Sequence, residues 1–398
     1  RGLKGFYRST NSATSFSTMA TSPNLLGCIS TGSDTGGQGW YDLCVAASPL
    51  NKDEVVVGGV NVWRTTNGGT NWTLYGHWTG SGAPFTHADH HDLEYDAAGT
   101  LFNCNDGTVY RRTATNWQEI SGLMNISQIY KIGTSALTAN FWITGHQDNG
   151  TSYWNGTTYA ARMGGDGMDC FIDRTNNANM FASYYSGAFR YSTNTGASWN
   201  TPSGLSGTGN WVSPWKQDPS NANNVWAGRQ QMFRSTNKGV NFTATAGSMS
   251  GTSTIVEFAI APTNGNILYV IKGTAIWKTT DAGATWTNIT GTVPTGSGAP
   301  TFITVSPTDA NKLWVTLSGY SAGNKVFMST NGGTTWTNYT SNLPNLPANC
   351  SVYQVGTNDM LYVGMDVGVY YRDNLSSTWT LYNTGLPNTP VFDMEISP

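Results

Sequence analysis

The strongest constraint on this chain is a short motif that recurs along its length. The clearest copies occupy residues 62–72, 276–286 and 326–336, and each runs from an apolar stretch through Thr or Ser, Asn or Asp and Gly to Trp. Residues 189–199 and 232–242 follow the same scheme, and degenerate copies lie elsewhere. The closing aromatic residues are spaced 40 to 56 residues apart, at positions 16, 72, 117, 159, 199, 242, 286, 336 and 379. A period of this length indicates a repeat architecture.

The chemistry of the motif is that of a hairpin turn. The Asp or Asn side chain accepts hydrogen bonds from backbone N–H groups, and Gly adopts the positive φ that the turn requires. The closing aromatic residue packs back onto the sheet. We therefore assign a structural role to the Asp-box residues, which are Asn67, Asn194, Asn237, Asp281 and Asn331.

Two further strand-like runs precede each turn, as in residues 256–261 and 267–271, so each unit has four strands. Four strands at this period predict an all-β fold, a β-propeller of eight or nine four-stranded blades with Asp-box turns between the third and fourth strands. Residues 39–387 are expected to hold about eight full blades. Residues 1–20 resemble the outer strands of a partial blade, and 391–398 resemble an inner strand. We expect one propeller over 1–398, as a fragment of a larger polypeptide.

Composition narrows the possible partners. Only 11% of the residues are charged and the net charge is −3, with no run of Lys or Arg, so a nucleic-acid partner is not expected. No apolar stretch of 18 residues occurs, so membrane insertion is not expected either. The five Cys lack metal-type spacing, although Cys28 and Cys44 flank a Gly-rich loop and could form one disulfide.

Several strings in order resemble a known group of propellers. They include residues 37–42 (Gly-Gln-Gly-Trp-Tyr-Asp), 87–92 (His-Ala-Asp-His-His-Asp), 145–150 (Gly-His-Gln-Asp-Asn-Gly) and 164–168 (Gly-Gly-Asp-Gly-Met). The chain resembles Asp-box propellers of the sortilin and oligoxyloglucan-hydrolase type, and most closely large secreted proteins of Bacteroidota. The resemblance implies a secreted or cell-surface protein whose sorting domain, of the type 9 secretion kind, is separate.

The same strings supply candidate functional residues. Strand order places the turns that carry them at the end of the blades opposite the Asp boxes. The candidates for ligand binding are His87, Asp89, Asp106, His146, Asp148 and Asp166. Asp106, Asp148 and Asp166 could also hold calcium through carboxylates and turn carbonyls; no other cofactor is expected. A purely structural role for these Asp residues stays open as an alternative, because Asp beside Gly is also an ordinary turn sequence. Trp40 and Trp78 lie outside the box pattern and are candidates for exposed sugar-stacking platforms.

These residues lead to two functional hypotheses. The first is an extracellular binding or adhesion module for a glycan or a protein partner, favoured by the low charge and by the absence of a strong catalytic motif. The alternative is a glycoside hydrolase, which would use two carboxylates, with Asp89 and Asp148 as candidates. Glu257, in an inner-strand pattern, has no obvious partner nearby in the sequence.

Overall fold

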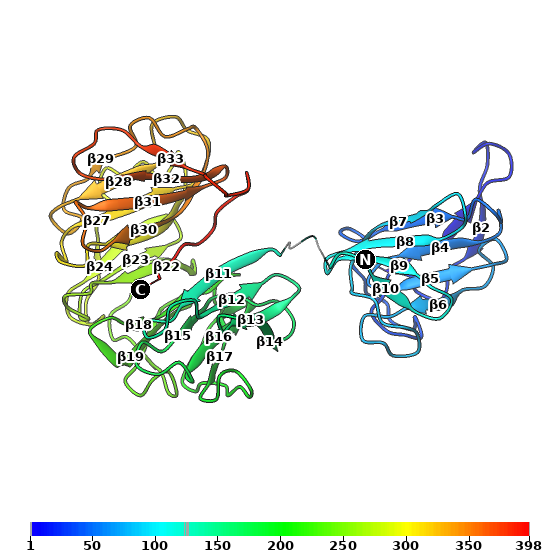
Figure 1. The fold of residues 1–398 in the computed structure, drawn as a ribbon, viewed down its shortest axis with the longest axis horizontal. Coiled ribbons are helices and arrows are strands. Elements are labelled where there is room, and N and C mark those ends of the chain that lie inside the picture. Colours follow the sequence, from blue (N-terminus) through cyan, green and yellow to red (C-terminus); the bar gives the residue numbers. More distant parts are fainter. Residues whose placement is uncertain (1, 123, 125–126, 398) are drawn as a thin grey trace. The chain divides into compact units, whose positions relative to one another are not determined.

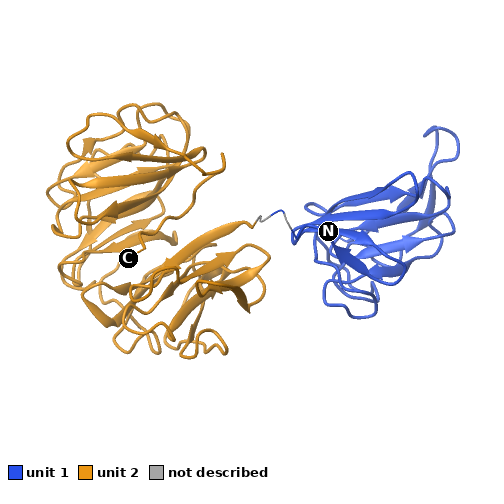
Figure 2. Ribbon diagram, in the orientation of Figure 1, with its two compact units in different colours: residues 1–126 blue, residues 127–398 orange. Residues whose placement is uncertain are grey.

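The structure is a computed structural model that describes residues 2–122, 124 and 127–397. Its regular elements are almost all strands; the one helical turn among the described residues is the 3-10 segment η1 (Tyr185–Gly187). No helix of the described part is long and apolar enough to cross a bilayer. The chain divides into two compact units, residues 1–126 and 127–398 (Figure 2), and each is treated separately below.

The first unit contains three antiparallel sheets (Figure 1). A two-stranded ladder precedes two four-stranded sheets of order β3-β4-β5-β6 and β7-β8-β9-β10. The bounds are β1 (Phe6–Arg8), β2 (Ser17–Ala20), β3 (Cys44–Ala47), β4 (Val55–Gly58), β5 (Val62–Thr65), β6 (Thr73–Gly76), β7 (His90–Tyr95), β8 (Leu101–Asn105), β9 (Val109–Arg112) and β10 (Trp117–Glu119).

The described residues of the second unit form six antiparallel sheets, each with its strands in chain order. The first three comprise β11 (Ile129–Thr134), β12 (Trp142–His146), β13 (Gly150–Trp154), β14 (Tyr159–Met163); β15 (Cys170–Ile172), β16 (Met180–Tyr184), β17 (Ala188–Ser192); β18 (Trp215–Asp218), β19 (Asn221–Gly228), β20 (Met232–Ser235) and β21 (Thr243–Ala244). The last three comprise β22 (Ile255–Ile260), β23 (Leu268–Lys272), β24 (Ala275–Thr279), β25 (Thr287–Asn288); β26 (Pro300–Val305), β27 (Leu313–Leu317), β28 (Val326–Ser329), β29 (Thr337–Asn338); β30 (Ala348–Gln354), β31 (Met360–Met365), β32 (Gly368–Arg372) and β33 (Thr380–Tyr382).

The predicted fold class is confirmed: consecutive four-stranded antiparallel sheets are the blades of a β-propeller. The sheet β15–β17 differs, since its fourth strand is reduced to one bridge between Tyr191 and Asn200. Pro202 lies two residues after Asn200 and has no N–H to extend a ladder. Apolar residues of successive blades form the core, as where Ile271 of β23 packs with Ile303 of β26. That burial is the main stabilising contribution of each blade interface.

The repeated turns share one hydrogen-bond pattern, and we call the five turns around Asn67, Asn194, Asn237, Asp281 and Asn331 the box turns. In the last of them, Asn331 Oδ1 accepts from Thr335 N at 2.9 Å, and Ser329 Oγ accepts from Gly333 N at 2.8 Å. The other four repeat both bonds at their own positions. Asn or Asp therefore closes the turn through its oxygen, while Gly333, at φ 86°, allows the chain to reverse.

Replacing Asn331 by Ala should lower the free energy of unfolding by about 1 kcal/mol, because the Thr335 N–H loses its acceptor. Asn331→Asp keeps the acceptor and should change stability by only a few tenths of a kcal/mol. Urea denaturation of both variants measures the difference. Equal losses in the two variants would contradict the assigned role.

Aromatic residues that close the turns also connect the blades. Trp199 Nε1 donates to Arg162 O, Trp336 Nε1 to Ile289 O and Trp379 Nε1 to Tyr339 O, and each acceptor belongs to the preceding repeat. Each of these Trp residues also contributes to, or packs against, an apolar cluster. This agrees with an inter-blade role.

Two expectations differ from the structure. All five cysteines are free, so Cys28 and Cys44 do not form a disulfide. Residues 391–397, expected as an inner strand, join no ladder. This segment instead runs back among the strands of the second unit (Figure 1), where Val391 N donates to Met365 O at 3.0 Å. A ladder needs a partner strand on its free side, and none of the described residues of this unit supplies one.

Candidate functional site

Two of the predicted carboxylates meet in the second unit. Asp148 lies in the turn between β12 and β13 with φ 58°, and Asp166 precedes β15. Asp166 Oδ1 accepts a hydrogen bond from Asp148 N at 3.0 Å. The Asp166 carboxylate therefore stabilises the turn that carries Asp148. This is the ordinary turn role that the sequence analysis left open, and the two carboxylates nevertheless lie together as a binding site would require.

His146, at the end of β12, is a buried structural residue. Its Nδ1 contacts Ser127 Oγ at 2.6 Å and its Nε2 contacts Thr144 Oγ1 at 2.7 Å. Burial lowers the pKa of the imidazole, which favours the neutral ring. Both ring nitrogens are engaged within the protein, so His146 is a poor candidate for a ligand contact.

An aromatic cluster lies beside Asp148 and Asp166, and we call Tyr130, Gln147, Asp166, Tyr185 and Trp211 the Trp211 rim. Trp211 stacks on Tyr185 with ring centroids 5.2 Å apart and planes 11° from parallel. Trp211 Nε1 donates to the Tyr130 hydroxyl at 3.0 Å, and that hydroxyl donates to Gln147 Oε1. Burial and the nearby charges of Asp166 and Asp148 raise the pKa of Tyr130.

The rim is open to solvent. Trp211 is 46% exposed and Tyr185 is 51% exposed, although both are large aromatic residues. Sequence reasoning missed both of them. A signal existed, because Trp211 follows a Gly-rich loop outside the box pattern, as Trp40 does. Tyr185 had no comparable signal, because only the tertiary structure places it against Trp211.

In the first unit, Asp89 and Asp106 lie together, as predicted from the order of the strands: Asp106 N donates to Asp89 O at 3.3 Å. Asp106 accepts from the Tyr41 hydroxyl at 2.9 Å and contacts His91 Nε2 at 2.6 Å. Gln38 Nε2 donates to Asp89 Oδ1 at 2.9 Å. The strings around residues 37–42, 87–92 and 105–107 thus converge on one site.

Asp42 belongs to this site and was not among the predicted residues. It has no exposed surface, and both of its carboxylate oxygens lack a hydrogen-bond donor in the described part of the chain. Burial and the charge of Asp89 raise its pKa to about 7, and when protonated it donates to Asp89. Burial and the charge of Asp106 raise the pKa of Asp89 as well. Asp42 had a sequence signal, since it ends the string at 37–42.

The histidines near this site have separate roles. The ring of His87 packs on Gly107, where a Cβ atom would lie 2.3 Å from His87 Cγ. His90 is buried, its Nδ1 contacts Gly59 O at 2.7 Å, and burial lowers its pKa to about 4. The neutral His90 ring is thus a core residue.

Trp40 and Trp78 are both exposed. Trp40 is 76% exposed, with its ring 5.7 Å from that of Tyr41. Trp78 is held more firmly, because its Nε1 donates to Cys28 O at 3.2 Å. Of the three residues expected to hold calcium, Asp106 belongs to the first unit and Asp148 and Asp166 to the second.

A buried cluster of charges joins the inner strands of the second unit. Glu257 lies between Lys131 Nζ at 3.2 Å and Lys216 Nζ at 2.9 Å. Asp393 accepts from Ile132 N at 3.1 Å and lies 3.6 Å from Lys131 Nζ. The partners of Glu257 thus come from other blades, which its sequence neighbourhood did not show.

The pKa values in this cluster follow its charge balance. Contact with the two ammonium groups lowers the pKa of Glu257 despite its burial. Burial raises the pKa of Asp169 to about 7, although its Oδ2 accepts from Trp215 N.

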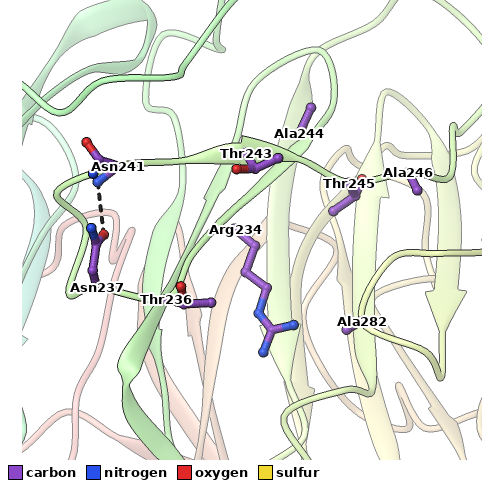
Figure 3. A pocket seen from close by; sticks show the side chains of 9 residues that line it. All are labelled: Arg234, Thr236, Asn237, Asn241, Thr243, Ala244, Thr245, Ala246 and Ala282. Carbon is purple, nitrogen blue, oxygen red and sulfur yellow. Dashed lines mark hydrogen bonds between the residues drawn. The ribbon is translucent and has the colours of Figure 1, made fainter.

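A pocket of about 340 Å³ lies at the box turn of sheet β18–β21 (Figure 3). Its lining residues are Arg234, Thr236, Asn237, Asn241, Thr243, Ala244, Thr245, Ala246 and Ala282. Arg234 is the one charged member of this lining, and its guanidinium lies 5.3 Å from the Trp226 ring centroid. The pocket contains no carboxylate and is therefore unsuited to acid–base chemistry on a glycosidic bond.

Comparison with known proteins is consistent with this architecture. Residues 230–374 match the model of a family described as sortilin, neurotensin receptor 3. The GH74 xyloglucanase from Xanthomonas campestris superimposes with a TM-score of 0.57 and 13% identity, covering 95% of this chain and 58% of that one. The extracellular domain of a putative one-component system from B. thetaiotaomicron gives a TM-score of 0.51 and 13% identity, covering 100% and 54%.

No curated protein matches the chain significantly. The chain spans little more than half the length of these two solved relatives, and at 13% identity they show the fold alone. The predicted resemblance is thereby confirmed: residues 230–374 match the sortilin family model, and the chain has the β-propeller fold that the solved xyloglucanase also has.

Proposed function

We propose that this chain is an extracellular binding module for carbohydrate, and that the Trp211 rim is its principal contact surface. The stacked and exposed pair of Trp211 and Tyr185 carries the proposal. A flat aromatic surface offers a large apolar area to the C–H face of a sugar ring, and it loses little conformational entropy on binding.

Polar groups beside the platform suit the hydroxyls of a sugar. Asp166 contributes a carboxylate, and Tyr130 and Gln147 contribute a hydroxyl and an amide that already form a chain with Trp211. A few fixed polar groups next to an apolar surface are typical of small-ligand sites. The hydrogen-bonded rim keeps the Trp211 ring in one orientation, so little order has to be gained when a ligand binds.

One observation favours the alternative, a glycoside hydrolase. The pair of Asp42 and Asp89 retains a proton near neutral pH, as a general acid must. However, the two carboxyl groups hydrogen-bond directly to each other. Glycosidase carboxyls stand ~5–5.5 Å apart for retention or ~6.5–9.5 Å for inversion, with the scissile bond between them. Direct contact leaves no room for a substrate between these two carboxyl groups, so this pair does not support hydrolysis.

The test is calorimetric titration of the full chain with xyloglucan, β-glucan and sialoside oligosaccharides, followed by product analysis. We expect saturable binding of at least one class without products, and an affinity at least about tenfold lower in Trp211→Ala, equivalent to about 1.4 kcal/mol. Trp211→Phe keeps a stacking ring and should lose less.

Tyr320→Ala is the matched control, because Tyr320 is an exposed aromatic residue of the same unit outside the rim. Equal weakening by Trp211→Ala and Tyr320→Ala would contradict the assigned surface. Oligosaccharide products that disappear in Asp89→Ala or Asp148→Ala would replace binding by hydrolysis. Capture of a protein partner with no response to any sugar would favour the protein-interaction alternative.

A further inference from the structure

The carboxylate of Asp42 requires a physical explanation. It has no exposed surface, and neither of its oxygens accepts a hydrogen bond from the described residues. Its own N–H donates instead to Gln38 O at 3.1 Å. A buried carboxylate without donors strongly destabilises the folded state unless a proton or a cation neutralises it. Buried polar groups in folded proteins are nearly always satisfied, and an unpaired one points to a missing partner.

A shared proton accounts for only part of this arrangement. When Asp42 is protonated, it donates once to Asp89 and thereby satisfies one of its two oxygens. The second Asp42 oxygen stays buried without a donor. A cation bound by both oxygens would satisfy the whole group.

We propose that Asp42 and Asp89, together with the amide oxygen of Gln38, bind a divalent cation, and that this cation is calcium. Gln38 donates from its amide nitrogen to Asp89 Oδ1 at 2.9 Å, and a half-turn of the amide would bring its oxygen to that position. Asp89 and Gln38 are half-buried, which gives the ion a route from solvent. Two carboxylates balance the charge of a divalent ion.

The donor set selects the metal. Carboxylate and amide oxygens suit calcium, whereas zinc and copper prefer imidazole and thiolate. The neighbouring imidazoles are engaged elsewhere, His90 with Gly59 O and His91 with Asp106 Oδ1. Magnesium demands a stricter octahedral geometry and usually retains several waters, which the enclosed Asp42 does not favour. The residues of this site belong to the first unit, whereas those of the Trp211 rim belong to the second.

The test uses the full chain, stripped with chelator and titrated with calcium chloride alone in a calorimeter. We expect one calcium ion per chain and a rise in melting temperature with calcium concentration. Asp42→Asn and Asp89→Asn should each weaken calcium binding at least about tenfold. If Asp42→Asn fails to fold, Asp89→Asn and direct metal analysis of the dialysed wild-type chain still decide the question.

Asp96→Asn is the matched control, because Asp96 is an exposed turn residue of the same unit whose Oδ1 accepts from Thr100 N. Asn keeps that acceptor, and calcium affinity should not change. The proposal is overturned if the wild-type chain binds no calcium, if magnesium binds as tightly, or if the Asp42 and Asp89 variants bind calcium like the Asp96 variant. A chain that binds sugars normally without calcium would leave the proposed function intact.

Discussion

Replacing Glu257 by Leu is expected to destabilise the second unit by about 3–5 kcal/mol. Glu257 is 2% exposed and contacts the ammonium groups of Lys131 and Lys216 at 3.2 and 2.9 Å. Without its charge, the Lys216 ammonium loses its carboxylate partner and Lys131 keeps only Asp393, at 3.6 Å. Chemical denaturation with intrinsic Trp fluorescence measures the loss.

A double variant separates the charge effect from the packing effect. Glu257→Leu combined with Lys216→Met removes one charge of each sign and leaves Lys131 paired with Asp393, so it should be more stable than Glu257→Leu alone. A loss below about 1 kcal/mol in the single variant would contradict a buried ion pair, because exposed pairs have values of that size. A double variant whose loss of unfolding free energy equals the sum of the two single losses would also contradict the ion pair.

The stability of the second unit is also expected to fall as pH rises from about 4 to 7, because of Asp169. Burial raises the pKa of this 7% exposed carboxyl from 3.8 to about 7. In that window the folded protein keeps a proton that the unfolded chain has lost, so the free energy of unfolding falls with rising pH. Above the folded pKa the loss is complete and constant, at most about 4 kcal/mol. The charges that face Asp169 are those of Lys131, Lys216 and Glu257.

Asp169→Asn should make this fall smaller, because the amide cannot ionise yet still accepts from Trp215 N through its oxygen. Urea denaturation of both proteins at pH 4, 5, 6, 7 and 8 gives the comparison. We expect the variant to gain stability relative to the wild type as pH rises. Asp309→Asn serves as the control, since Asp309 is exposed and its Oδ1 accepts a hydrogen bond from Asn311 N, which the Asn amide oxygen can also do. Parallel pH curves for Asp169→Asn and the wild type would contradict the raised pKa.

The two binding regions differ in what supports them. The Trp211 rim is an exposed surface whose side chains already hold one another in place, which suits a ligand that arrives from solvent. The site around Asp42 is enclosed, and its unpaired oxygens suit a small ion. Sugar titration and calcium titration therefore test different parts of the chain, and either result stands without the other.

The local part of this structure followed from the sequence. Each box turn is closed by bonds between residues two and four positions apart, such as those among Ser329, Asn331, Gly333 and Thr335. All these contacts therefore lie within one short segment, residues 329–335. The strands between the turns show either alternating apolar and polar residues or continuous apolar residues. The order of the strands was enough to predict that Asp106 lies beside Asp89. The blade architecture could be predicted for the same reason.

The chemistry of the sites was decided by the tertiary structure. Glu257 meets Lys131 from 126 residues away. Likewise, Asp42 and Asp89 interact only because two neighbouring blades bring their first strands together. Tyr185 forms a stacking surface for a sugar only together with Trp211, which the loop before β18 places against it. Burial, which sets the pKa values of Asp42 and Asp169, is a property of the packed blades. A sequence pattern encodes contacts within one turn, whereas the distances and desolvation that create a site arise from contacts between blades.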